Sequence, residues 1–119
     1  MYKLHAILNE KGERYIYENE ITGFMITKAG DILLNCVNKK QVYYPNHSWV
    51  IIELRAEYDY EIEAQELLIA DGEYRYRITS HQIDMQTGIM QAFTQSNEDE
   101  PAECVYIFNP SNIDFITVE

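Results

Sequence analysis

The chain has 119 residues, 46% of them apolar and 24% charged, a composition typical of a folded protein and unlike that of disordered chains. Twenty acidic residues against nine basic ones give a net charge of −11. Because binding to a nucleic-acid backbone draws on Lys and Arg, this charge argues against a direct DNA or RNA partner and against anionic membranes. It favours a basic protein surface as partner, such as that of a nucleic-acid-binding protein.

The length fits a single compact domain spanning residues 1–119. The first residues lack the apolar core of a signal peptide, and no apolar run approaches the roughly 20 residues of a membrane span, so we expect a cytoplasmic protein. Cys36 and Cys104 have no CxxC pair and no His at zinc-ligand spacing. We predict two reduced thiols that fill the core, no metal and no cofactor.

Period-two alternation of apolar and polar residues predicts strands through most of the chain, and many Tyr, Ile, Val and Thr residues support this. Turn residues separate the predicted strands, as in Ala29-Gly30-Asp31, and the acidic stretch 96–102 is expected to be a loop. The fold class is therefore mostly β, as a small antiparallel β-barrel or sandwich. The expected strands are 2–8, 14–17, 23–28, 32–38, 41–44, 48–55, 74–78, 89–95, 104–108 and 113–118.

Residues 57–71 fit two structures. Tyr58, Tyr60 and Ile62 alternate with acidic residues, as in a half-exposed strand, while Tyr60, Ala64 and Leu67 also fit one face of a helix. Asp71-Gly72, between two apolar runs, is a strong signal for a hairpin turn and favours the strand.

A weak internal repeat is visible at a spacing of about 60 residues. The segment Val42-Tyr43-Tyr44-Pro45-Asn46-His47-Ser48 resembles Val105-Tyr106-Ile107-Phe108-Asn109-Pro110-Ser111, and an apolar strand follows each. A strand, a short turn and a final strand in this order are similar to the end of small Sm-like or SH3-like barrels. The resemblance implies two tandem half-repeats of about 55–60 residues, 1–56 and 57–119, with an unrelated single sandwich as the alternative.

The sequence contains no motif of a nucleophilic enzyme, and its five glycines are isolated, so we do not expect an enzyme. The three histidines, His5, His47 and His81, are scattered and are expected at the surface or at caps. On a strand, Asp59, Glu61 and Glu63 would share one face, which is more typical of a solvated surface than of a cation site.

Two acidic stretches are the strongest functional signal, since residues 57–73 contain seven acidic residues and no basic one. We expect a non-enzymatic inhibitor that covers a basic partner, similar in composition to phage anti-defence proteins, nucleic-acid mimics and immunity proteins. An open strand edge would also suit a homodimer. The predicted partner-binding residues are Glu57, Tyr58, Asp59, Glu61, Glu63, Glu66, Glu98, Asp99, Glu100 and Glu103.

The alternative function is a binder that sequesters a small ligand such as a nucleotide signal. Tyr74, Arg75, Tyr76 and Arg77 would hold it, because Tyr rings stack on bases and Arg pairs with phosphates.

Overall fold

The computed structural model describes residues 2–9, 11–18, 20–56, 65–69, 74–95, 104–113 and 116–118, and for residues 65–69, 74–75 and 116–118 it describes the backbone alone. The described chain is mostly β, as predicted, and its only helices are two 3₁₀ turns, η1 (Asn46–Ser48) and η2 (Pro110–Asn112). The strands are β1 (Leu4–Leu8), β2 (Arg14–Tyr17), β3 (Ile21–Ile26), β4 (Ile32–Cys36), β5 (Gln41–Tyr44), β6 (Ile51–Arg55), β7 (Gln65–Ile69), β8 (Tyr74–Ile78), β9 (Ser80–Ile83), β10 (Met90–Thr94), β11 (Cys104–Phe108) and β12 (Ile116–Val118).

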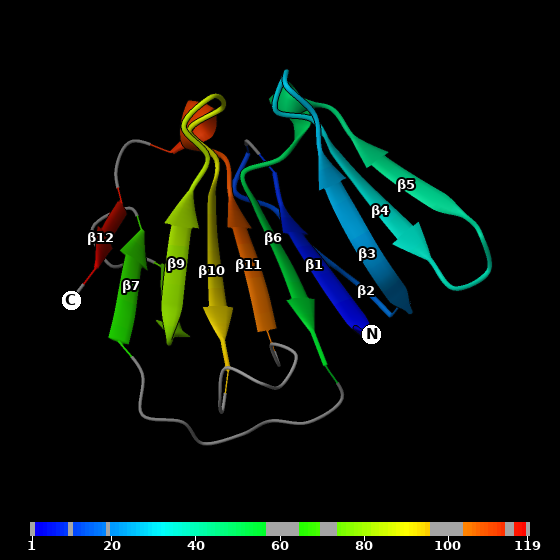
Figure 1. Cartoon of the computed structure of the whole chain (residues 1–119), viewed down its shortest axis with the longest axis horizontal. Coiled ribbons are helices and arrows are strands. Elements are labelled where there is room, and N and C mark those ends of the chain that lie inside the picture. Colours follow the sequence, from blue (N-terminus) through cyan, green and yellow to red (C-terminus); the bar gives the residue numbers. More distant parts are fainter. Residues whose placement is uncertain are drawn as a thin grey trace.

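The strand pairs of the described residues are all antiparallel and form three sheets (Figure 1). The central sheet has six strands in the order β2-β1-β6-β11-β10-β9, and two smaller sheets have the orders β3-β4-β5 and β12-β7-β8. Among the described strands no sheet closes into a barrel, which corrects the barrel expected from the sequence. β1 lies second in this sheet, and β6 and β11, which are far apart in sequence, are neighbours in its middle.

Two apolar cores lie on opposite faces of the central sheet. Alternate residues of β6 divide between them, because Ile51 packs with Tyr76 and Ile78 of β8, while Ile52 packs with Ile32 and other residues of β3 and β4. Both faces of the middle strands are therefore covered, which explains the continuous apolar runs in β1, β6 and β11. Sequence alternation alone predicts one buried face for the first strand, but both faces are buried.

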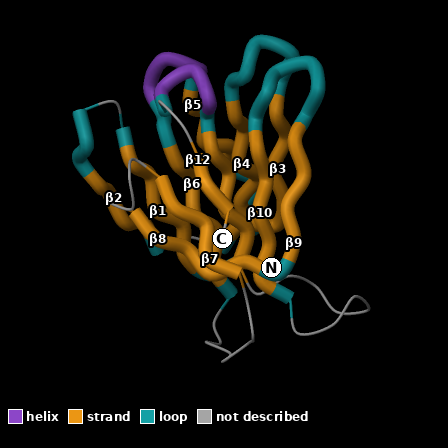
Figure 2. The backbone as a smooth tube through the Cα atoms, turned by 90° about the vertical axis from the view of Figure 1, so that its left-hand side faces the viewer, coloured by secondary structure: helices purple, strands orange, loops and turns teal. Residues whose placement is uncertain are grey.

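The two 3₁₀ turns lie side by side at one end of the sheets (Figure 2). Asn109, fully buried, caps η2, and its Nδ2 donates to the carbonyl oxygens of Asn46 (2.8 Å) and Trp49 (3.1 Å). Asn112 donates to the same two carbonyls at 3.1 and 2.8 Å. These bonds link the end of the first half of the chain to the end of the second, at the top of the β6–β11 ladder.

Predicted and observed strands agree closely for 14–17, 41–44, 74–78 and 104–108. Within the ambiguous stretch 57–71, residues 65–69 form β7 and pair with β8, as the hairpin signal predicted, and the rest lies outside the described residues. The sequence did not predict β9, whose four residues are all exposed. Cys36 and Cys104 are both half-buried thiols.

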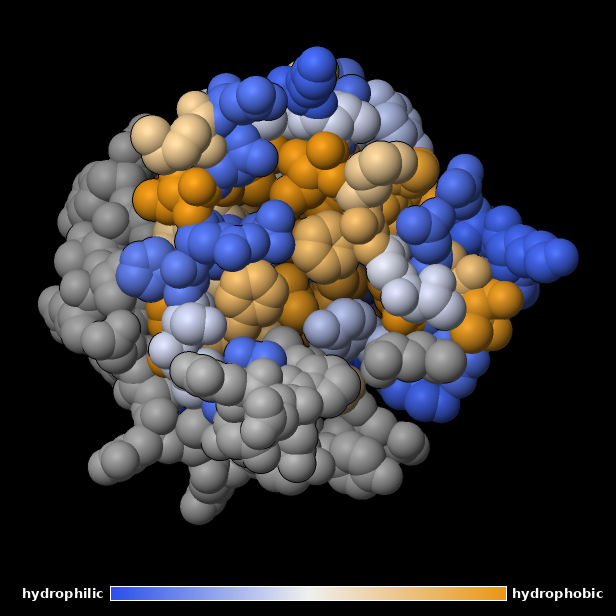
Figure 3. All heavy atoms as spheres, viewed as in Figure 1, coloured by the Kyte–Doolittle hydropathy of each residue, from blue (hydrophilic) through white to orange (hydrophobic). Residues whose placement is uncertain are grey.

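Apolar side chains also reach the surface. On the face drawn in Figure 3 they gather near the middle, with hydrophilic residues along the upper and right-hand borders. Phe24 and Phe93 are among the partly buried residues that pack against the core between the central sheet and β3-β4-β5. The small sheet therefore leaves part of this core exposed at its margin.

Candidate functional site

The two acidic segments are attached to neighbouring positions of the central sheet. Arg55, at the end of β6, pairs with Cys104, at the start of β11. The first acidic segment follows Arg55 in the chain, and the second precedes Cys104. The nonlocal β6–β11 pairing thus brings together, at one end of the molecule, the two points from which the acidic segments extend. We call this the acidic end.

The negative charge of the chain is concentrated in these segments. Residues 57–66 contain five acidic residues and residues 98–103 contain four, with no basic residue in either. The other eleven acidic residues nearly balance the nine basic ones. An unbalanced cluster of this kind produces a local negative potential that a balanced surface lacks.

The side chains of the predicted partner-binding residues lie outside the described part of the structure. Glu66 is in β7, where only the backbone is described. The others are Glu57, Tyr58, Asp59, Glu61, Glu63, Glu98, Asp99, Glu100 and Glu103.

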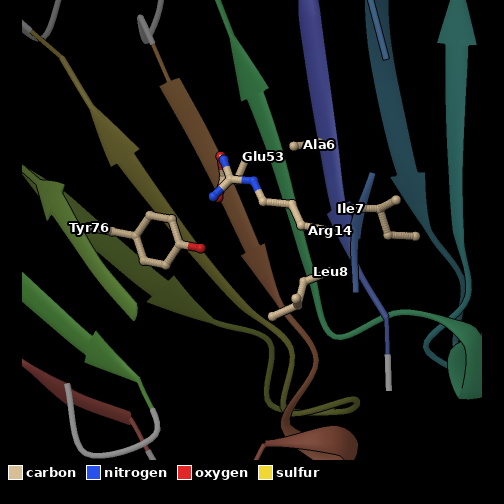
Figure 4. A pocket seen from close by; sticks show the side chains of 6 residues that line it. All are labelled: Ala6, Ile7, Leu8, Arg14, Glu53 and Tyr76. Carbon is tan, nitrogen blue, oxygen red and sulfur yellow. The ribbon is translucent and has the colours of Figure 1, made fainter. Parts of the chain in front are cut away.

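One acidic side chain of β6 is buried next to this end. Glu53 is 3% exposed, and its Oε2 accepts from Arg14 Nη2 at 2.7 Å and from Arg55 Nη2 at 3.2 Å. Although burial alone would lower the pKa of Arg55, the negative charge of Glu53 raises it. In Figure 4 the Tyr76 hydroxyl points toward Arg14 and Glu53. Sequence analysis did not predict this buried ion cluster. The available signal was the charged Glu53 inside the apolar run Ile51-Ile52-Glu53-Leu54.

The Glu53 cluster is packed rather than open to a substrate. A cavity of only about 10 Å³, which has room for one water molecule at most, lies among Arg14, Glu53, Tyr76 and residues 6–8 of β1 (Figure 4). Burial, followed by the charge of Glu53, raises the pKa of Tyr76, so this phenol stays protonated. The cluster joins β1, β2, β6 and β8 structurally.

The alternative ligand residues do not form a set on one surface. Tyr76 is buried and its ring packs against Tyr106 and Phe108, with centroids 4.8 and 5.5 Å away. Arg77 is exposed on the opposite face of β8, and the side chains of Tyr74 and Arg75 lie outside the described structure. A ring already packed in the core cannot also stack on a base.

The histidines differ from expectation at one position. His5 is 1% exposed, not at the surface; it stacks on Tyr17 with centroids 4.9 Å apart, and its Nε2 lies 3.2 Å from the Tyr44 hydroxyl. Burial lowers the pKa of His5. His47 is in η1 and His81 in β9, both exposed.

Comparison with known proteins gives no family for this chain: no family model matches it, and no curated protein or solved structure is significantly similar. Within the described ranges, no three His, Cys, Asp or Glu residues are grouped so that they could hold a metal ion. The same ranges contain no helix long and apolar enough to cross a bilayer.

Proposed function

We propose that the protein is a non-enzymatic binding protein whose acidic end covers a basic surface on a partner, as an anti-defence, nucleic-acid-mimic or immunity-type inhibitor would. The observation that carries this proposal is the Arg55–Cys104 pair, which joins the attachment points of the two acidic segments. The two segments carry nine carboxylates and no basic residue, a fitting complement to a cluster of Lys and Arg.

The charge distribution supports recognition of a basic patch rather than general acidity. Clustered carboxylates accelerate encounter with an oppositely charged surface and repel DNA, RNA and anionic membranes. A partner that itself binds nucleic acid presents such a patch, and the acidic end would then occupy the place of the phosphates. Binding of this kind weakens as salt screens the charges.

The proposal also includes the internal architecture: two tandem half-repeats, 1–56 and 57–119, each an open variant of the Sm-like or SH3-like arrangement. Equivalent pairings support it, since β1 pairs with β2 and β6, and β7 pairs with β8 and β12. Likewise β4 pairs with β3 and β5, and β10 pairs with β9 and β11. A 3₁₀ turn precedes the last strand of each half, and Gly30 and Gly88, both with positive φ, precede β4 and β10.

Paired charge reversals test the acidic end. The probe is a fluorescent peptide rich in lysine, whose binding is followed by anisotropy, together with displacement of duplex DNA from a basic DNA-binding domain. We expect Glu61→Lys with Glu63→Lys to weaken peptide binding about tenfold or more, and about 0.3 M salt to weaken binding of the unaltered protein similarly.

The matched control reverses two exposed glutamates elsewhere, Glu13→Lys with Glu18→Lys, which changes the net charge equally. If both double variants lose the same affinity, net charge and not the acidic end drives binding, and the proposal fails. The proposal fails as well if the unaltered protein leaves the DNA complex intact at stoichiometric excess.

A further inference from the structure

Two strands at opposite sides of the molecule have open edges that match each other. β2 leads into β3 and β8 into β9 along the chain, and these two steps, which are not strand pairings, join the three sheets into one series. The series runs from β5 through β4, β3, β2, β1, β6, β11, β10, β9, β8 and β7 to β12. Among the described strands, β5 and β12 are the two ends of this series. Figure 1 shows them on opposite sides of the fold, so they do not pair within one chain.

The chain already contains one contact of the kind these two edges could make. If the halves are equivalent, β11 corresponds to β5 and β12 corresponds to β6. The β6–β11 ladder therefore joins the last strand of one half to the meander edge of the other, over five residue pairs. The open edges of β12 and β5 belong to the strands that correspond to β6 and β11, and among the described strands they do not form the equivalent ladder.

The backbone of β5 has the hydrogen-bonding phase that such a ladder needs. Cys36 N donates to Lys40 O at 2.9 Å, and alternation then directs the Val42 and Tyr44 backbone groups to β4. The N–H and C=O groups of Gln41 and Tyr43 therefore point to the open edge. In β11 the corresponding residues are Val105 and Ile107, and these bond β6, as the Asn109 N to Val50 O bond of 2.8 Å indicates.

We propose that copies of the chain associate head to tail, with β5 of one copy pairing antiparallel with β12 of the next. This inference rests on the proposed half-repeats and not on the acidic end. Equivalent positions are found by counting from the 3₁₀ turns η1 and η2. The in-chain pair Ile107–Ile52 then corresponds to Tyr43–Ile116 between copies, and Tyr106–Glu53 corresponds to Val42–Thr117. The contact is heterologous, so it continues from copy to copy and closes into a ring or forms a filament.

The contact between copies lacks part of the in-chain junction. Asn109, which donates its backbone N–H and its amide across β6–β11, is replaced at the equivalent position by Pro45, which has no N–H. We therefore expect reversible association that depends on concentration.

Light scattering after size exclusion should give a mass above 14.0 kDa that rises between about 10 and 200 μM. A mass of 14.0 kDa throughout would overturn the proposal.

Cross-linking two different single variants tests the partner strand. Val42→Cys and Thr117→Cys are made separately in a Cys36→Ser/Cys104→Ser background, because a non-hydrogen-bonded pair has Cα atoms about 4.5 Å apart, within disulfide range. After oxidation we expect a disulfide dimer from the mixture and none from either variant alone. A dimer of Val42→Cys alone means symmetric β5–β5 pairing and overturns the proposal. So does the absence of a dimer from the mixture when circular dichroism shows both variants folded.

Discussion

A buried ion cluster at Glu53 connects β2, in the first β-hairpin, to β6, and its strength depends on how little water reaches it. The Glu53 side chain is 4% exposed, but its partners Arg14 and Arg55 are 43% and 38% exposed. Removing the carboxylate leaves two guanidinium groups without their partner, which is more costly than breaking an exposed pair. The arginines retain access to water, which moderates that cost.

We expect Glu53→Ala to lower the free energy of unfolding by about 2–3 kcal/mol. The matched control is Glu20→Ala, which removes the exposed Lys3–Glu20 pair (2.6 Å) and should cost about 1 kcal/mol or less. Urea denaturation of the two variants provides the comparison. Equal losses would show that the burial of Glu53 adds nothing.

His5 makes stability depend on pH near neutrality. Its folded-state pKa is lowered from 6.5 by burial, so the unfolded chain binds the proton more readily than the folded chain. Stability is therefore complete above about pH 6.5 and decreases as the pH falls below that value. We expect a lower urea midpoint at pH 5.5 than at pH 7.5, and a smaller decrease in His5→Phe, which keeps a ring on Tyr17. The same slope in both proteins would refute this origin.

At the scale of elements, the turn between β3 and β4 fixes the position of the central tryptophan. Gly30 has φ +84° and its carbonyl oxygen accepts from Trp49 Nε1 at 3.2 Å and from Asn46 Nδ2 at 3.3 Å. A Cβ at residue 30 would collide with Asn46 Nδ2. The positive φ adds strain for any side chain there.

Gly12, in the β1–β2 turn, is the natural comparison, because its φ is +78° but nothing lies within 4 Å of a Cβ built on it. Gly12→Ala should cost about 1–2 kcal/mol, the backbone strain alone. Gly30→Ala should cost more, about 3 kcal/mol or above, because Asn46 must also move. Thermal unfolding of the two variants tests this ranking, and a Gly30→Ala loss no larger than the Gly12→Ala loss contradicts it.

The elements themselves were largely predictable and their assembly was not. Local alternation identified β2, β5, β8 and β11, because side-chain period and turn residues are local properties. The sequence alignment behind the proposed repeat is one residue out of phase with the two 3₁₀ turns, since η1 begins at Asn46 and η2 at Pro110, not at Asn109. The pairing of β6 with β11 is nonlocal, so the sequence did not predict it. Without this pairing, neither the closeness of Arg55 and Cys104, where the acidic segments begin and end, nor the burial of Glu53 could be derived.

At the scale of the whole molecule, the two cores are shared between the halves. Ile7 and Ile32 from the first half pack in one core with Val105 and Ile107 from the second, and Ile51 packs in the other core with residues of β8 and β10. Separating the halves would expose apolar surface on both faces of β6 at once. The two proposed half-repeats are therefore expected to unfold together.

We therefore predict a single cooperative transition in urea. Trp49, the one tryptophan, is fully buried in the first half and reports on that half by fluorescence, while far-ultraviolet circular dichroism reports on all strands. The two curves should coincide, and Asn109→Ala, which removes the buried amide that links the halves, should move both to lower urea by the same amount. If fluorescence and circular dichroism separate, the halves unfold independently and the shared cores do not couple them.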